Sequence, residues 1–63
     1  GPALTTEGKP LKDYVEAFER MLIDNTMRRH KGSIVAVMEE LCLPRRTLNE
    51  KMAKYGLTRG DYV

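Results

Sequence analysis

Residues 31–57, KGSIVAVMEELCLPRRTLNEKMAKYGL, decide the fold of this 63-residue chain. Apolar side chains recur in both halves of the stretch at the three- and four-residue steps of a helix. They are Ile34, Val37, Met38 and Leu41 in the first half, and Leu48, Met52 and Tyr55 in the second. The spacing predicts two short helices, over residues 33–41 and 45–55, whose apolar faces turn inward.

Turn-forming residues mark where each short helix begins and ends. Ser33 offers a hydroxyl that caps free backbone N–H groups at the start of the first helix. Pro44 disfavours a helical Leu43 but suits the first turn of a new helix, and Gly56 ends that helix. Two short helices joined by residues 42–44 are the arrangement of a helix-turn-helix.

A longer helix is predicted before this pair, over residues 11–30. One apolar row runs along it at steps of three and four: Leu11, Val15, Phe18, Leu22 and Thr26. A second row, with Tyr14, Ala17 and Met21, widens the apolar stripe beyond what one neighbouring surface needs. His30, Lys31 and Gly32 end the helix, because cations suit its C-terminal dipole and Gly accepts a left-handed conformation.

The remaining residues lie at the two ends of the chain. Residues 1–10 hold two Gly, two Pro and two Thr, which predict a flexible linker. Gly1 and Pro2 resemble the pair left when an affinity tag is cleaved off. Residues 11–63 are expected to form one all-α domain, with a last turn capped through Thr58 and Asp61.

Charge is divided unevenly along the chain. Residues 1–27 hold three basic and five acidic side chains, whereas residues 28–59 hold eight basic and three acidic ones. The two parts therefore carry net charges of −2 and +5, although the whole chain carries only +2. Such a division indicates that the second part faces a polyanion.

The outward face of the 45–55 helix carries groups that can read base edges. With the apolar side chains buried, the residues on this face that we expect to contact bases are Arg45, Arg46, Asn49 and Glu50. Arg pairs with guanine, Asn with adenine, and Glu accepts from cytosine. For Asn49 and Glu50 an ordinary solvated role stays open, because a rotation of the helix by one position decides whether they reach bases.

Four further residues suit DNA phosphates. Thr47, Lys51 and Lys54 flank this face. Ser33 opens the 33–41 helix, whose free N–H groups also suit a phosphate. The cations at residues 28–31 are interpreted as complementing a helix end, with phosphate contact as the alternative.

The stretch from Lys31 to Leu57 resembles the Fis-type helix-turn-helix at the C-terminus of bacterial sigma-54-dependent activators. The turn RRTL at 45–48 and the run KMAKYGL at 51–57 are similar to that family's ending, and residues 15–30 resemble the helix before it. Within the family, VMEELCLPRRTL is most similar to the C4-dicarboxylate transport response regulators. The resemblance implies a three-helix fold, binding of double-stranded DNA at an upstream activator site, and a two-component parent protein with receiver and ATPase domains.

The sequence departs from the family pattern at two places. The family usually has a Gly where Cys42 sits, and two Ala where Val37 and Met38 sit. The first departure asks a non-Gly residue to make the turn at a positive φ. The second makes the contact between the two short helices bulkier.

The wide apolar stripe of the long helix needs a cover that two short helices do not supply. The residues expected to lie in a dimer interface are Tyr14, Val15, Phe18, Met21 and Leu22. A second copy packed through this helix covers them, and two-fold symmetry then places the recognition helices about 34 Å apart on an inverted repeat. The alternative is that this face docks on the ATPase domain of the parent protein.

A protein-interaction module that dimerises without reading DNA is the rival function. No enzyme, cofactor or metal site is indicated, because His30 has no partnered carboxylate or nucleophile in its sequence context and one Cys with one His cannot fill a four-ligand zinc site. The lone Cys42, with neither a signal-peptide pattern nor an apolar run of membrane length, favours a cytoplasmic protein.

Overall fold

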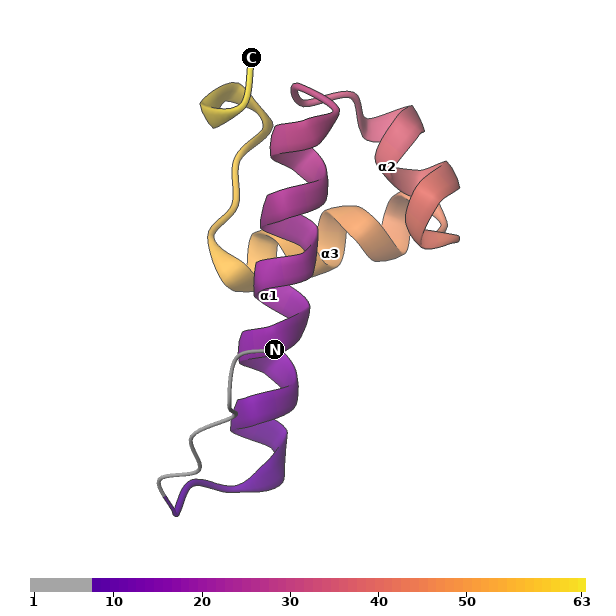
Figure 1. Cartoon of the computed structure of the whole chain (residues 1–63). Coiled ribbons are helices and arrows are strands. Elements are labelled where there is room, and N and C mark those ends of the chain that lie inside the picture. The colour runs from indigo at the N-terminus through magenta and orange to yellow at the C-terminus, as the bar shows by residue number, and fades with distance from the viewer. Residues whose placement is uncertain (1–7) are drawn as a thin grey trace.

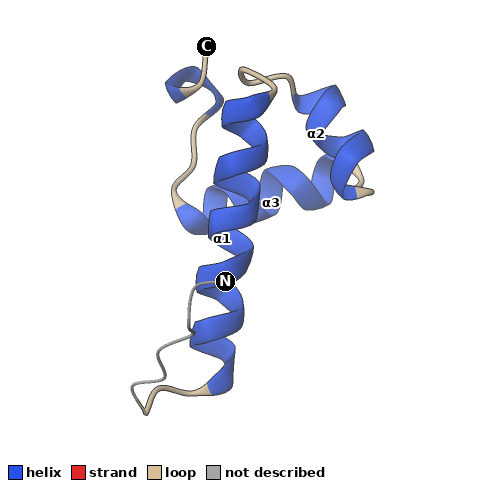
Figure 2. Cartoon of the chain, in the orientation of Figure 1, coloured by secondary structure: helices blue, strands red, loops and turns tan. Residues whose placement is uncertain are grey.

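The computed structural model describes residues 8–63, and within them the chain is all-α, as predicted. Its elements are α1 (Leu11–Arg29), α2 (Ile34–Leu41), α3 (Arg45–Tyr55) and the 3₁₀ turn η1 (Arg59–Asp61). Figure 2 shows that loops join these helical elements. The expected tag remnant, Gly1 and Pro2, and residues 3–7 of the expected linker lie outside the described residues.

The two short helices pack beside the C-terminal half of α1 (Figure 1). α3 crosses α1 near its middle, α2 lies beside its end, and the first turns of α1 project beyond both. This projection gives the molecule an elongated shape, with principal extents of 36, 24 and 21 Å. The two short helices therefore pack against only part of the length of α1.

A small core forms where the three helices meet. Its buried apolar side chains are Ile23 and Met27 of α1, Val37 of α2, and Leu48 and Met52 of α3. Thr26 is buried with them and donates its hydroxyl to a carbonyl one turn earlier, at 2.7 Å. The predicted inward positions of Leu48 and Met52 are confirmed. Tyr55 packs against this core but is only partly buried, and its hydroxyl donates to Glu19 of α1.

All three helices end in the same backbone motif. In each, a residue with positive φ follows the helix, and the next N–H donates to a carbonyl five residues back. The donors are Gly32, Leu43 and Leu57, and their acceptors are the carbonyls of Met27, Met38 and Met52, at 3.0, 3.1 and 2.8 Å. The chain thus satisfies carbonyls that a helix end otherwise leaves without a backbone partner.

The residues with positive φ at these ends are not all glycines. Gly56 ends α3 as predicted, with φ of 69°. Cys42 has φ of 55°, so the positive φ expected at this departure from the family pattern is present. At the end of α1 both Lys31 and Gly32 have positive φ, 53° and 84°, although the sequence indicated this conformation only for the glycine.

Replacing Cys42 by Gly is expected to raise the free energy of unfolding by about 0.5–1 kcal/mol. A β-carbon in the left-handed region costs roughly 1–2 kcal/mol, and the extra freedom of Gly in the unfolded chain offsets part of the gain. The Cys42 thiol contributes only a long contact to the Glu39 carbonyl, at 3.8 Å. Urea denaturation followed by circular dichroism measures the change.

The matched control is Gly56→Ala, which adds a β-carbon at the corresponding position after α3. We expect it to lower the free energy of unfolding by about 1 kcal/mol. A Cys42→Gly chain no more stable than the parent contradicts the assignment of strain to this turn.

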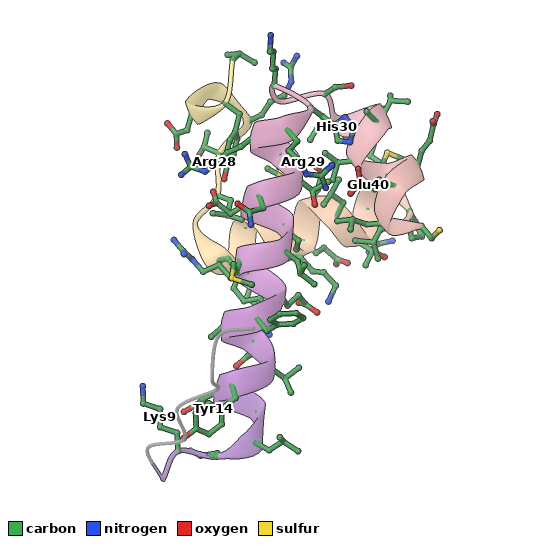
Figure 3. All side chains as sticks on the ribbon, viewed as in Figure 1. Lys9, Tyr14, Arg28, Arg29, His30 and Glu40 are labelled. Carbon is green, nitrogen blue, oxygen red and sulfur yellow. The ribbon has the colours of Figure 1, made fainter. Side chains whose placement is uncertain are left out.

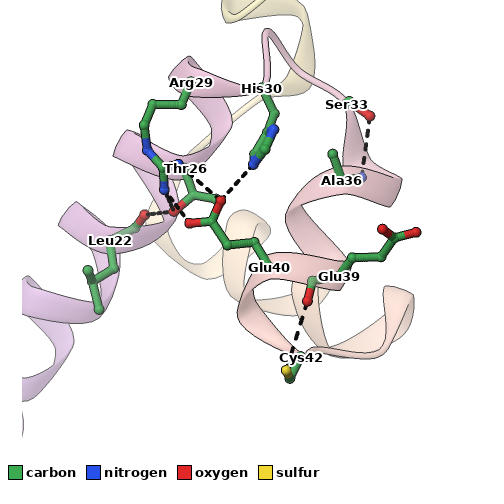
Figure 4. Close-up of polar contacts among 9 residues, drawn as sticks. All are labelled: Leu22, Thr26, Arg29, His30, Ser33, Ala36, Glu39, Glu40 and Cys42. Atoms are coloured by element: carbon green, nitrogen blue, oxygen red, sulfur yellow. Dashed lines mark hydrogen bonds and ion pairs between the residues drawn. The ribbon is translucent and has the colours of Figure 1, made fainter.

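A side chain caps the start of α2, whereas only a backbone hydrogen bond closes η1. Ser33 caps α2 as predicted, since its hydroxyl oxygen accepts from the N–H of Ala36 at 3.3 Å (Figure 4). The last turn expected near Thr58 is present as η1, but Thr58 makes no side-chain cap there, so the expected capping box is wrong. The backbone closes this turn instead, through Asp61 N–H and the Thr58 carbonyl at 3.0 Å.

A cluster of charged side chains joins the end of α1 to α2 (Figures 3 and 4). Glu40 of α2 pairs with the guanidinium of Arg29, and its Oε1 lies 2.7 Å from Nε2 of His30. Hydrogen bonds from Arg29 and then His30 lower the pKa of Glu40 to about 2. His30, for which the sequence showed no carboxylate partner, therefore has one through the fold, and its position at the helix junction is structural.

Candidate nucleic-acid interface

The outward face of α3 carries the four residues predicted to contact bases. Arg45, Arg46, Asn49 and Glu50 are all exposed. On the opposite side of the helix, Leu48 and Met52 are 0% and 5% exposed, so core packing fixes which face turns outward. Nε of Arg46 lies 3.9 Å from Oε2 of Glu50, a loose and solvated pair. Such an exposed ion pair contributes little to the free energy of folding, so contacts of either side chain with a base edge can replace it.

Two lysines predicted to contact phosphates bind carboxylates of α1. Nζ of Lys51 lies 3.0 Å from Oε1 of Glu19, and Lys54 pairs with Glu16. The hydroxyl of Tyr55 donates to the same Oε1 of Glu19 at 2.6 Å. These contacts tie α3 to α1, a role that the sequence did not suggest for either lysine.

The ties between α3 and α1 are charged at neutral pH. Hydrogen bonds from Tyr55 and then Lys51 lower the pKa of Glu19, and the hydrogen bond from Lys54 lowers the pKa of Glu16. Both carboxylates are thus ionised well below pH 7. Their attraction for the lysines is present above the ordinary Glu pKa and is lost only as the pH falls through the lowered values.

A cleft of about 420 Å³ opens beside the starts of α2 and α3. Its lining residues are Lys31, Ser33, Ile34, Val35, Arg45 and Arg59. Three of these six are cationic and none is acidic. Ser33 and Arg45 were predicted DNA contacts, whereas Thr47, a further predicted phosphate contact, is half-buried on α3. Arg59 was missed because it reaches the cleft from η1, and only its charge marks it in the sequence.

The apolar stripe of α1 is uncovered over most of its length. The exposed fractions of Val15, Phe18, Met21 and Leu22 are 54%, 54%, 47% and 41%. Tyr14, the fifth residue predicted to lie in a dimer interface, is half-buried, and its hydroxyl accepts from the N–H of Lys9 at 3.1 Å (Figure 3). The stripe runs into the core at its C-terminal end, since Thr26 of the same row is buried and Leu22 lines a hollow together with Ile23. A second copy on the exposed part stays a prediction.

Two short helices joined through a left-handed turn, the second with an exposed basic face, define a helix-turn-helix of the DNA-binding class. The family described as "Bacterial regulatory protein, Fis family" matches residues 14–55. This match covers two thirds of the chain, from the first turns of α1 to the end of α3. The chain belongs to this family.

Curated relatives are bacterial regulators much longer than this chain. The phosphoglycerate transport system transcriptional regulatory protein PgtA of Salmonella typhimurium is 41% identical over 59 residues, which is 94% of this chain and 14% of PgtA. The C4-dicarboxylate transport transcriptional regulatory protein DctD of Pseudomonas aeruginosa is 43% identical over 56 residues, 89% of this chain and 12% of that protein. DctD of Rhizobium meliloti is 28% identical over 61 residues, 97% of this chain and 13% of its own length. No solved structure matches the chain.

The relatives confirm the similarity to C4-dicarboxylate transport regulators that the sequence indicated. The phosphoglycerate transport regulator is similar to nearly the same degree. The domain therefore identifies a family of regulators and does not single out one transported compound.

Two other kinds of feature are absent from residues 8–63. No helix there combines the length and the apolar character needed to cross a bilayer. No group of three or more His, Cys, Asp or Glu side chains lies close enough together there to hold a metal ion.

Proposed function

We propose that this chain binds double-stranded DNA sequence-specifically at an upstream activator site, as the DNA-binding part of a bacterial sigma-54-dependent transcriptional activator. One observation carries the proposal: core packing at Leu48 and Met52 turns the polar and basic face of α3 outward, where it is free to meet base edges. Membership of the Fis family and relatives named as transcriptional regulators support it. A protein-interaction module that does not read DNA has no comparable support.

In the proposed complex, α3 enters the major groove with its N-terminal end leading. Arg45 and Arg46 lie in the first turn of α3 and bind guanine edges. Asn49 binds adenine, and Glu50 accepts from cytosine. The loose Arg46–Glu50 pair separates when these contacts form, at little cost in free energy.

The phosphate contacts in this proposal come from the edges of the same surface. Ser33 and Thr47 contribute hydroxyl groups, while Lys51 and Lys54 contribute charge. Lys51 already pairs with Glu19, and Lys54 with Glu16. To bind a phosphate, each lysine must therefore leave its carboxylate or contact the carboxylate and the phosphate together. We therefore expect each of these lysines to contribute less than an unpaired lysine does.

Dimerisation belongs to the same proposal. Two copies associate through the exposed stripe of α1, so the two α3 helices meet an inverted repeat. The parent protein carries receiver and ATPase domains and acts in the cytoplasm, where promoter DNA lies. The chain covers only 14% of PgtA and 12% of the Pseudomonas aeruginosa DctD, and a parent protein with further domains is consistent with these fractions.

Selection of bound duplexes from a random pool tests the function directly. We expect an enriched inverted repeat, and an affinity for it that falls steeply as the salt concentration rises, since bound lysines and arginines displace counterions. Titration of the selected duplex and of a random duplex at two salt concentrations measures both properties. Weak, sequence-independent binding with no enriched motif would contradict the proposal.

Replacing Asn49 by Ala is expected to reduce the preference for the selected duplex by about 1–3 kcal/mol while leaving binding to random duplex nearly unchanged. The amide makes a base contact in this proposal, so its loss affects only DNA that presents the matching base. Fluorescence anisotropy on the two duplexes measures the ratio of affinities. The control is Asn25→Ala, the same substitution at an exposed position of α1. Equal losses on both duplexes would place Asn49 away from the bases.

A further inference from the structure

The C-terminal residues lie outside the part of the chain that the family match covers, yet they pack on the start of the helix-turn-helix. The match ends at residue 55, and η1 follows it. Nε of Arg59 donates to the Gly32 carbonyl at 2.9 Å, and the hydroxyl of Tyr62 donates to Asp24 of α1 at 2.6 Å. A β-carbon at Gly32 would lie only 2.8 Å from Cγ1 of Val63, which shows how closely this segment approaches. The C-terminal turn is thus held against the loop between α1 and α2.

This packing brings cations from three separate segments to one cleft. Lys31 comes from the loop after α1, Arg45 from the first turn of α3, and Arg59 from η1. The other three lining residues are uncharged, so no carboxylate in the lining offsets this charge. Elsewhere on α3 the arrangement differs, because Lys51 and Lys54 face Glu19 and Glu16 of α1. The cleft therefore gathers three cationic side chains with no acidic side chain in its lining.

The cleft adjoins the face of α3 that we assign to base contacts. Arg45 belongs to both surfaces, since it is exposed in the first turn of α3 and lines the cleft. In the proposed complex, a phosphate close to the base that Arg45 reads comes within reach of Lys31 and Arg59, because all three line the same cleft. The hydrogen bond to the Gly32 carbonyl uses only the Nε–H of Arg59, and the terminal nitrogens of its guanidinium are further donors.

We propose that Arg59 and Lys31 form a DNA phosphate site in this cleft, supplied in part by the C-terminal turn that follows the recognition helix. This inference rests on the proposed DNA-binding function and extends it to residues beyond the family match. The occupant is a backbone phosphate of the duplex that α3 reads. Such a contact adds affinity and fixes the position of the domain on the duplex without reading sequence.

The test compares Arg59→Gln with Arg20→Gln, which removes the same charge from an exposed position on α1. We expect Arg59→Gln to weaken binding to the selected and the random duplex by the same factor. The slope of log affinity against log salt concentration should become shallower by about 0.9, the share of one phosphate contact. Arg20→Gln should leave the slope unchanged.

A second variant separates the charge of the cleft from the packing of the C-terminal turn. Arg59→Gln also removes the hydrogen bond to Gly32, so urea denaturation accompanies the binding measurement. Lys31→Gln leaves that hydrogen bond in place, and we expect from it the same change in salt slope.

The outcomes distinguish this inference from the function on which it rests. A parent chain that binds no duplex overturns the proposed function and the phosphate site together. A parent chain that binds with the expected salt dependence, while the folded Arg59→Gln and Lys31→Gln variants keep its slope, overturns the phosphate site alone. A loss confined to the selected duplex also overturns it, because a phosphate contact does not distinguish sequences.

Discussion

Replacing Leu48 by Ala is expected to leave most of the chain unfolded at room temperature. Leu48 is 0% exposed and belongs to a core of only five buried apolar side chains within residues 8–63. Loss of a buried Leu side chain costs about 2–5 kcal/mol, through lost transfer free energy and the cavity left behind. A chain of this size buries only about 60% of its unfolded surface, so it has little stability to lose. Far-UV circular dichroism and urea denaturation measure the effect.

The control for this prediction is Leu11→Ala, the same substitution at a position that is 78% exposed. Its expected effect on the free energy of unfolding is within about 0.5 kcal/mol, the usual range for surface changes. A Leu48→Ala chain that keeps its helicity and loses less than about 1 kcal/mol would show that α3 is not anchored through this side chain.

Replacing Phe18 by Asp is expected to weaken self-association of the chain by at least about 100-fold. Two-fold symmetry puts each substitution in the proposed interface twice, so its cost counts twice. Each copy loses about 1–2 kcal/mol of apolar burial and must also desolvate a carboxylate without a partner. Sedimentation equilibrium measures the dissociation constant, and each 1.4 kcal/mol corresponds to a factor of ten.

Val35→Asp is the matched control for the association measurement. Val35 of α2 is 52% exposed, close to the 54% of Phe18, but it lines the cleft at the start of the short helices instead of the stripe. We expect it to leave the mass distribution unchanged. Equal effects of the two substitutions, or a parent chain that is monomeric at high concentration, would contradict dimerisation through α1.

Local rules predicted most of the fold, because the helices here are set by residues near one another in the sequence. The three- and four-residue steps around Leu48 and Met52 identified the buried face of α3, and Ser33 and Gly56 marked helix ends through their own backbone chemistry. The positive φ of Cys42 followed from a family comparison at one position. These features need no knowledge of how the helices pack.

Contacts between residues far apart in the chain could not be predicted from the sequence. Tyr55 and Glu19 are 36 residues apart, and their hydrogen bond depends on the angle at which α3 crosses α1. Helical periodicity gives the face of a residue but not this angle, so Lys51 was assigned to phosphate without its carboxylate partner. The position of Arg59 in the cleft depends in the same way on how η1 folds back onto Gly32.

The shared core around Leu48 and Met52 and the hydrogen bond from Tyr55 to Glu19 join α3, the helix that we propose reads DNA, to the helix that carries the apolar stripe. In the dimer that we propose, each α3 is consequently fixed in angle as well as in distance relative to its counterpart. About five base pairs, half a turn of the double helix, rotate one half of an operator to the opposite side of the duplex. We expect a rigid pair of this kind to reject an operator with such an insertion even when every base that it reads is intact. In the dimer that we propose, the phase between the two halves of the operator is then part of what is recognised.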